Sequence, residues 1–301
     1  MEERPRMKPK ISVVITVFND AFRIGNSVRA VMAQPLPPGT FECVVVDDGS
    51  TDNSSEVARN AGARIVRLEK NSGIGAARNA GAAAAQADWV ALTDADCVVS
   101  RRWLASLLAE IEKADASVLA VAGKIHGLDS RTPASRFIDL VGGLDAATYL
   151  KHDTMPWAPG GNVAYRREHL LAEPFDARLN AYETAELHLR LTNRFGGRVV
   201  YAPTALVLHE HRKTWRALWK QQRNYGVGYA QFIFKHADRW PWGIRRELRQ
   251  WRHLMGFVLR SCWKRGDAGL AERGSFVKYL ALRVGFLSVW FSRDRLKRRT
   301  A

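Results

Sequence analysis

The sequence predicts an α/β domain with a mostly parallel, Rossmann-like sheet flanked by helices, followed by a basic helical extension. Strand-like and helix-like segments alternate through the first 125 residues, as they do in parallel sheets covered on both faces. Acidic or glycine-rich turns follow three of the strands. Arginine, lysine and tryptophan are concentrated after residue 211. We therefore expect a domain over residues 1–211 and a separate helical region over 212–301.

The elements follow from hydrophobic pattern and from proline and glycine positions. Apolar, β-branched runs predict strands, and helices are expected between them. The first helix is ended by Pro35, the second by Gly62, and the helix before residue 196 by Gly196 and Gly197. The expected strands are 11–17, 41–48, 63–69, 88–96 and 198–202, and the expected helices are 22–34, 53–62, 76–87 and 183–195.

The last ninety residues differ sharply in charge from the rest. The chain has a formal net charge of +16, and residues 212–301 hold 22 Lys and Arg against 5 Asp and Glu, with seven of the ten Trp. Apolar residues recur at helical spacing from Thr214 and again over 244–262. Basic helices carrying Trp suit an anionic membrane surface. The alternatives are an acidic protein or glycan, packing against the chain's own domain or a second copy, and nucleic acid. Nucleic acid is the least expected of these partners.

Compartment signals point to the inside of a cell. The N-terminal MEERPRMKPK has no apolar core of a signal peptide. The longest apolar run, 276–291, is interrupted by Lys278 and Arg283, so we expect no membrane-spanning helix. The three cysteines form no disulfide framework or metal-binding spacing, which favours a reducing compartment. A cytoplasmic protein held peripherally at the inner face of the cell membrane fits these signals.

Two carboxylates one residue apart end the expected fourth strand. In extended chain, residues two apart face the same way, so Asp94 and Asp96 can point together. Paired carboxylates suit a hard divalent cation such as Mg²⁺ or Mn²⁺, which in turn binds phosphate oxygens. The alternative is a solvated turn with an Asp helix cap.

Two further turns lie at strand ends. VVVDDGSTD (44–52) offers a carboxylate to a nucleobase N–H, although Asp, Gly and Ser also form ordinary turns. KNSGIGAARNAG (70–81) opens a helix after a strand, where phosphates bind. It has G-x-G, but Arg78 occupies the place of a third glycine, so a bidentate arginine–phosphate contact is favoured over a dinucleotide fingerprint.

Taken in order, these motifs resemble the family-2 glycosyltransferases of the GT-A fold, over roughly residues 10–225. The matching stretches are ISVVITVFND, VVVDDGSTD, NSGIGAARNAG, the TDAD turn, PGGNVAYRRE (159–168), the acidic helix at 183–191 and VLHEHR (207–212).

The resemblance implies a role for each matched residue. It assigns nucleotide and donor binding to Phe18, Asn19, Asp48, Arg78, Asp94, Gly160, Gly161 and Asn162. Among these, Asp48 would contact the base, and the 160–162 loop would lie beside the donor sugar and acceptor. The metal ligands would be Asp94, Asp96 and His209, with a structural histidine as the alternative for the last.

One departure from the family pattern concerns the general base. The family commonly has Glu-Asp-x-Asp/Glu-Leu with the Asp as base, whereas YETAEL places Thr184 there. Threonine is not a base at neutral pH. We expect Glu183 to be the base, with Glu186 as second choice. If both are merely solvated helix carboxylates, the enzyme is weak or inactive.

The resemblance implies a metal-dependent, inverting glycosyltransferase. It would move a sugar from a nucleoside-diphosphate sugar, with uridine diphosphate as the first expectation, to a hydroxyl of a glycan or lipid-linked acceptor. A non-catalytic glycan- or lipid-binding module derived from a transferase is one alternative. A nucleotidyltransferase is another, although the turn TVFND lacks the Gly-rich, basic signature of that class.

Overall fold

The computed structural model describes residues 8–151, 155–239 and 244–299, which fall into two compact units. The first, here the sheet unit, comprises the described residues up to Leu128, Leu144–Arg178 and Thr184–Glu210. The second, here the helical unit, comprises Asp129–Gly143, Leu179–Glu183 and the described residues from His211 on. The helical unit therefore includes two short segments that precede residue 211 in the chain.

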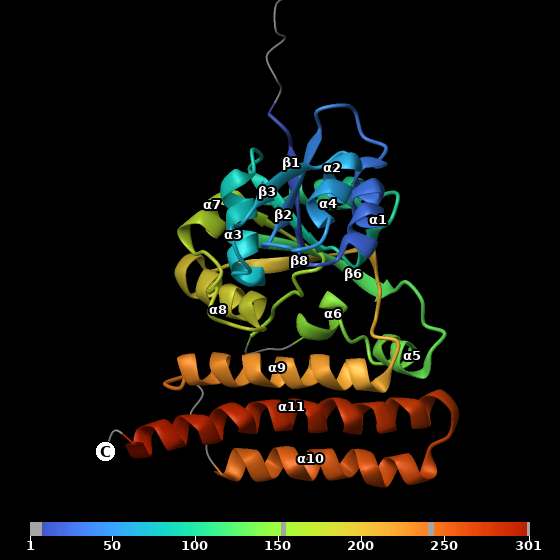
Figure 1. The fold of residues 1–301 in the computed structure, drawn as a ribbon, viewed down its shortest axis with the longest axis vertical. Coiled ribbons are helices and arrows are strands. Elements are labelled where there is room, and N and C mark those ends of the chain that lie inside the picture. Colours follow the sequence, from blue (N-terminus) through green and yellow to red (C-terminus); the bar gives the residue numbers. More distant parts are fainter. Residues whose placement is uncertain (1–7, 152–154, 240–243, 300–301) are drawn as a thin grey trace, which may run out of the picture. The chain divides into compact units, whose positions relative to one another are not determined.

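The sheet unit is built on one eight-stranded sheet with the order β3-β2-β1-β4-β7-β6-β8-β5 (Figure 1). The first four strands pair in parallel, as do β6 and β8, while β7 and β5 pair antiparallel with their neighbours. The strands are β1 (Ile11–Val17), β2 (Phe41–Asp47), β3 (Arg64–Arg67), β4 (Trp89–Asp94), β5 (Cys97–Val99), β6 (Val118–Gly127), β7 (Val163–Arg166) and β8 (Arg198–His209).

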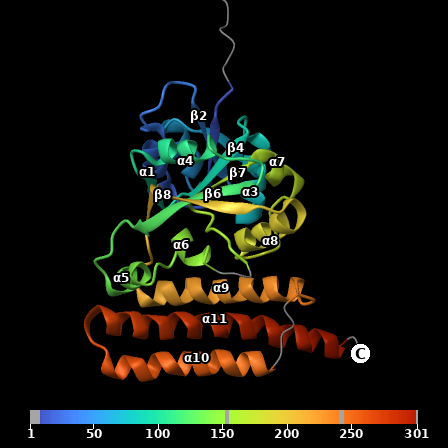
Figure 2. The same cartoon turned by 180° about the vertical axis from the view of Figure 1, so that it is seen from behind.

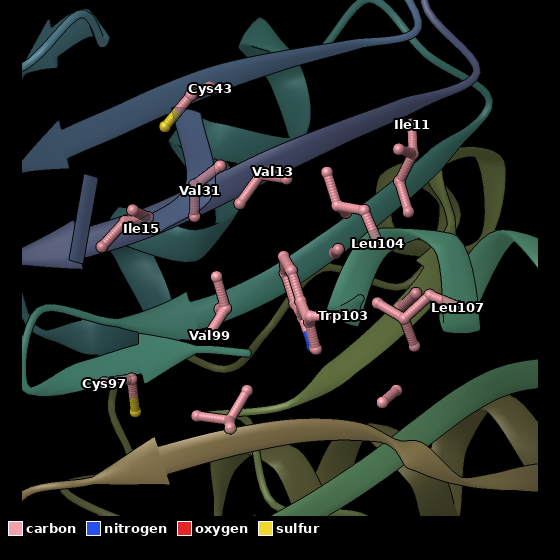
Figure 3. Close-up of a cluster of buried hydrophobic side chains, with 14 of the residues drawn as sticks. Ile11, Val13, Ile15, Val31, Cys43, Cys97, Val99, Trp103, Leu104 and Leu107 are labelled. Atoms are coloured by element: carbon pink, nitrogen blue, oxygen red, sulfur yellow. The ribbon is translucent and has the colours of Figure 1, made fainter. Parts of the chain in front are cut away.

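Helices cover both faces of this sheet, so both faces are apolar (Figures 1 and 2). One buried cluster joins the sheet to α1, α2 and α4, and Figure 3 shows part of it, with Cys97 at one side. The other cluster joins the sheet to α3, α7 and α8. The helices of this unit are α1 (Ala21–Met32), α2 (Ser54–Asn60), α3 (Ile74–Ala84), α4 (Trp103–Ile111), α6 (Ala146–Tyr149), α7 (Arg167–Ala172) and α8 (Glu183–Phe195), whose first residue belongs to the helical unit.

The predicted α/β class is confirmed, and the predicted elements before residue 100 lie within a few residues of their expected bounds. The strand expected over 198–202 was predicted too short, since β8 continues to His209. Pro203 interrupts the sequence pattern, because proline cannot donate a ladder hydrogen bond. The structure accommodates it with a register shift between β6 and β8, which pairs Gly123 with Ala202 and Lys124 with Leu206.

The helical unit consists of α5 (Pro133–Leu140), α9 (Trp215–Lys235), α10 (Ile244–Trp263) and α11 (Gly266–Arg299). Figures 1 and 2 show α11 lying between α9 and α10. Glycines permit the close approach of α9 and α11, since a Cβ at Gly226 would lie 2.1 Å from the Leu282 carbonyl oxygen and one at Gly285 would lie 2.0 Å from that of Arg223.

The helices predicted from Thr214 and over 244–262 are present, and Thr214 caps α9 by accepting a hydrogen bond from the Ala217 N–H. Trp240 and Trp242, two of the seven tryptophans of this region, lie outside the described residues. Among the helices described, none carries an apolar stretch long enough to cross a bilayer.

Candidate functional site

The turns after β1 and β2 hold each other in place at the carboxyl end of the sheet. Asn19 adopts a left-handed backbone with φ of 49°, and its side-chain oxygen accepts a hydrogen bond of 2.8 Å from the Thr51 N–H. In return, its own N–H donates to the Ser50 hydroxyl at 2.9 Å. Phe18, the residue before it, is 45% exposed and offers an aromatic face to solvent. The predicted pair Phe18 and Asn19 therefore lies on a fixed rim, where both residues are exposed.

Asp47, the last residue of β2, anchors the second turn from inside. Its buried carboxylate accepts hydrogen bonds from the Ser50 N–H and the Ser55 hydroxyl and pairs with Arg67 at 2.8 Å. Burial opposes ionisation, but the hydrogen bonds from Ser50 and Ser55 and the Arg67 charge outweigh it, so the pKa of Asp47 lies below its ordinary value. This carboxylate therefore stabilises the fold of the turn.

Asp48 shapes the next turn along the sheet edge. Its two carboxylate oxygens accept hydrogen bonds from the backbone N–H groups of Ser72 and Gly73, at 2.7 and 2.9 Å. The glycine-rich turn before α3 is thus tied to the turn after β2. The structure assigns Asp48 this positioning contact, and the predicted contact with a base stays a prediction.

Arg78 connects three segments at the same edge. It lies in α3 and is only 2% exposed, so its charge needs partners within the protein. One guanidinium nitrogen lies 3.1 Å from Asp94 Oδ1, and the other donates to the Thr184 hydroxyl at 3.3 Å. Asp94 therefore pairs with an arginine, and Thr184, which stands where the resemblance leads one to expect an Asp, contacts that same arginine.

The glycines of the 159–162 loop let the backbone pass close to this pair. A Cβ at Gly160 would lie 2.4 Å from a guanidinium nitrogen of Arg78, and one at Gly161 would lie 3.2 Å from Asp94 Oδ2. Glycine at 160 is thus required for this close approach, glycine at 161 eases it, and the predicted place of the loop beside the donor stays a prediction.

Asn162 faces inward and is 1% exposed. Its side-chain NH₂ donates to the carbonyl oxygens of Lys124 and Ala205, at 2.9 and 2.8 Å, where the register of β6 and β8 shifts. Its oxygen accepts a hydrogen bond of 2.8 Å from the indole N–H of Trp103. These contacts satisfy backbone groups freed by the irregular pairing, so the side chain of Asn162 stabilises the fold. Its predicted contact with the donor stays a prediction.

Asp96 lies in the turn between β4 and β5, beside His209, which is more than a hundred residues away in the sequence. Cys97 in β5 is the antiparallel partner of His209, the last residue of β8. Side chains that are directly opposite in an antiparallel pair project to the same face. The distance from His209 Nε2 to Asp96 Oδ1 is 3.4 Å, and Cys97 Sγ lies 3.9 Å from the same oxygen. Asp96, Cys97 and His209 each offer one donor atom, and these atoms all lie within 4.8 Å of one another.

Cys97 is the residue that sequence reasoning missed. It was counted only as one of three scattered cysteines, although it directly follows the TDAD turn. It is fully buried, and burial together with the nearby charges of Asp96 and Asp94 raises the pKa of its thiol well above the ordinary value. The thiol is therefore protonated at neutral pH unless a cation replaces its proton.

The two candidate bases have different surroundings. Both oxygens of Glu186 accept hydrogen bonds from Arg190 Nε, at 3.0 and 2.9 Å, and that arginine also pairs with Glu173 at 2.6 Å. Glu186 is fully buried in this ion-pair network. Glu183 is the first residue of α8 and is 8% exposed. Glu186 is thus an ion-pair partner inside the fold, and the choice of Glu183 as the base stays a prediction.

The segment leading to Glu183 is held by α9 within the helical unit. The Asn180 N–H donates to Gln231 Oε1 at 3.0 Å, and Tyr182 packs against Tyr229 with ring centroids 5.3 Å apart. Tyr182 takes a left-handed backbone with φ of 65°, an uncommon conformation for a bulky residue. These contacts set the point at which α8 begins.

Comparison with known proteins identifies the sheet unit. Residues 12–171 match the model of glycosyl transferase family 2. The chain is 30% identical over 238 residues to the pre-mycofactocin glycosyltransferase of Mycobacterium tuberculosis, covering 76% of this chain and 48% of that protein. It is 32% identical over 164 residues to the succinoglycan biosynthesis protein ExoO of Rhizobium meliloti, covering 54% of this chain and 45% of that one. The chain thus spans about half the length of the curated relatives that it matches.

Solved structures share the fold at lower identity. The mannosyltransferase PcManGT from Pyrobaculum calidifontis, in complex with GDP-Man and Mn²⁺, superposes with a TM-score of 0.66 at 18% identity, covering 93% of this chain and 87% of that one. The glucosyl-3-phosphoglycerate synthase from Mycobacterium tuberculosis, in complex with Mn²⁺, UDP and glucosyl-3-phosphoglycerate, gives a TM-score of 0.54 at 23% identity, covering 75% of this chain and 79% of that one. With the GT-A sheet and the family match together, the chain belongs to glycosyl transferase family 2.

Proposed function

We propose that this protein transfers a sugar from a nucleoside-diphosphate sugar to a hydroxyl of a glycan or lipid-linked acceptor, with Mg²⁺ or Mn²⁺ as cofactor and with inversion at the anomeric carbon. The observation that carries the proposal is the gathering of Arg78, Asp94, Asp96 and His209 at the carboxyl ends of parallel strands. Ligands of open α/β sheets bind at this edge.

The donor set fits a divalent cation. Two carboxylates and an imidazole are common ligands of such ions, and glycine at 161 keeps side-chain atoms out of the space beside Asp94. Asp96 and His209 would hold the cation, with Asp94 at its side. When bound, the cation supplies positive charge that stabilises the departing diphosphate.

The chain's own residues supply positioning and proton transfer. Arg78 is fixed by Asp94 and Thr184, so its charge is set in place before a diphosphate arrives. The turns tied by Asp48 and Asn19 form the rim where a base would lie, with Phe18 as an exposed aromatic surface. Glu183 would accept the proton of the acceptor hydroxyl as its oxygen attacks the anomeric carbon.

A donor-hydrolysis panel tests this function. Purified protein is incubated with UDP-, GDP- and dTDP-sugars, with Mn²⁺ or with a chelator, and nucleoside diphosphate release is measured. We expect release from one donor class, lost with the chelator and in Asp96→Ala. A non-catalytic binding module would bind a diphosphate without releasing it from any donor, and that result would refute the catalytic proposal.

We also propose that α10 docks on an anionic membrane surface. Its outward stripe consists of Leu248, Met255, Leu259 and Trp263, whose exposures are 57%, 52%, 64% and 88%. The repeated spacing of about one or two turns places these side chains on one side of the helix. Arg249 and Arg252, both exposed, supply positive charge for acidic headgroups.

Vesicle sedimentation tests this surface. The protein is expected to sediment with phosphatidylglycerol vesicles and far less with phosphatidylcholine vesicles. The double variant Met255→Asp/Leu259→Asp should bind at least about tenfold more weakly, because apolar area is lost and like charge is added. Phe22→Asp is the matched control, since Phe22 is 87% exposed on α1. Equal loss in both variants would contradict the proposal.

A further inference from the structure

We propose that Cys97 is itself a metal ligand, so that the cation at this edge of the sheet is held by a carboxylate, a thiolate and an imidazole from Asp96, Cys97 and His209. The inference rests on the proposed function, because it concerns the cation that a donor diphosphate would meet. Compared with the ligands expected from the sequence, Asp94, Asp96 and His209, it exchanges the carboxylate of Asp94 for the thiolate of Cys97.

The pairing of β5 with β8 builds this set. The register places Cys97 opposite His209, so sulfur and imidazole lie side by side on one face of the ladder. Asp96 is next to Cys97 in the preceding turn, and its backbone oxygen accepts a hydrogen bond of 2.9 Å from the Glu210 N–H. The turn is thus fixed to the end of β8 by this hydrogen bond and by the pairing of Cys97 with His209.

The spacing of the donors matches that around a tetrahedral ion. With bonds of about 2.1 Å to nitrogen and oxygen and about 2.3 Å to sulfur, tetrahedral angles separate the N and O donors by about 3.4 Å and the S and O donors by about 3.6 Å. The observed separations are 3.4 Å for His209 to Asp96 and 3.9 Å for Cys97 to Asp96. The third separation, between the donor atoms of Cys97 and His209, lies within 4.8 Å.

Gly161 lies beside both the sulfur of Cys97 and the carboxylate of Asp94. A Cβ at position 161 would lie 3.7 Å from Cys97 Sγ and 3.2 Å from Asp94 Oδ2. Asp94 itself is paired with Arg78, which explains why it stands beside the three-donor set rather than within it.

A thiolate changes which cations the site prefers. Sulfur ligands favour Zn²⁺, Co²⁺ and Cd²⁺, whereas Mg²⁺ prefers oxygen. As the metal–sulfur bond forms, the S–H bond breaks and its proton passes to solvent. We therefore expect this site to bind thiophilic cations more tightly than Mg²⁺.

Cobalt spectroscopy tests the inference directly. Cys43→Ala/Cys262→Ala removes the other two thiols and serves as the parent, and Cys97→Ser is added to it. The parent and the variant that also carries Cys97→Ser are each titrated with Co²⁺ in a spectrophotometer. Both proteins are also titrated with Cd²⁺ in a calorimeter. We expect a sulfur-to-cobalt charge-transfer band in the near ultraviolet for the parent and none after Cys97→Ser.

Cadmium affinity should fall at least about tenfold in Cys97→Ser, since even residues that merely support a ligand cost 10–100-fold when changed. Bound cobalt that shows visible ligand-field bands but no sulfur band in the parent would overturn the inference, whether or not Cys97→Ser folds. Unchanged cadmium affinity in a folded Cys97→Ser would overturn it as well. Donor hydrolysis measured separately keeps the two proposals apart, because release of nucleoside diphosphate without a sulfur band refutes only the cysteine ligand.

Discussion

Replacing Gly160 by alanine tests how tightly Arg78 is held beneath the 159–162 loop. The added methyl would lie 2.4–2.5 Å from three atoms of the guanidinium group. Ordinary contacts between non-bonded heavy atoms are about 3.5 Å, so the arginine or the loop must move by about 1 Å. The arginine cannot swing away cheaply, because Asp94 and Thr184 hold it. Overpacking of this kind costs about 1–3 kcal/mol.

The assay is urea unfolding of four proteins: wild type, Gly160→Ala, Arg78→Ala and the double variant. If the clash is with Arg78, the alanine at 160 should cost about 1–3 kcal/mol in wild type and close to nothing in Arg78→Ala. Gly161→Ala is the matched control, since its nearest contact is 3.2 Å, and it should cost less. A penalty for Gly160→Ala that is the same with and without Arg78 would refute the packing described here.

Three further predictions concern the base, the inward-facing asparagine and a buried carboxylate. Glu183→Gln should lower kcat by about 10²–10⁴-fold with little loss of stability. Glu186→Gln should mainly lower the free energy of unfolding, because it weakens the pair with Arg190. Steady-state kinetics and urea unfolding distinguish the two variants, and the opposite pattern would exchange the roles of the two residues. Asn162→Ala should destabilise the protein by about 2–4 kcal/mol, because it removes three hydrogen bonds, two of them buried and one part-buried. A change below about 0.5 kcal/mol in urea unfolding would show that water replaces the amide. The pKa of Asp47 is lowered in the folded state, so the ionised carboxylate contributes stability above about pH 4 that is lost as the pH falls toward the folded-state pKa. Asp47→Asn should therefore be less stable than wild type at about pH 7, and in a pH series of unfolding curves the difference should shrink below about pH 4. A difference that stays constant with pH would contradict this.

Local pattern was enough to predict the first half of the sheet. Continuous β-branched runs such as 11–17 are buried strands, and the turns after them meet at one edge because parallel strands all end there. This rule also brought Asp94 close to Arg78, two residues singled out from separate motifs. Such contacts follow from topology and need no knowledge of side-chain packing.

The remaining features depend on long-range register, which a single sequence does not encode in any local signal. The contact of Cys97 with His209 requires that β8 continue past Pro203 and pair antiparallel with β5. The inward role of Asn162 requires the register shift that Pro203 accompanies. Tyr182 adopts a left-handed backbone in the segment that α9 holds, although no glycine or asparagine marks its position.

Thermal unfolding with nucleoside diphosphates, in the presence and absence of Mn²⁺, tests most directly whether a cation at Asp96 holds the donor. At a ligand concentration of about 100 Kd, binding should add about 2.7 kcal/mol, which raises Tm by about 5 °C for a chain of this size. We predict this increase for one diphosphate with Mn²⁺, and its loss without the metal and in Asp96→Ala. Stabilisation of the same size without metal, or in Asp96→Ala, would contradict the claim that a cation at Asp96 holds the donor.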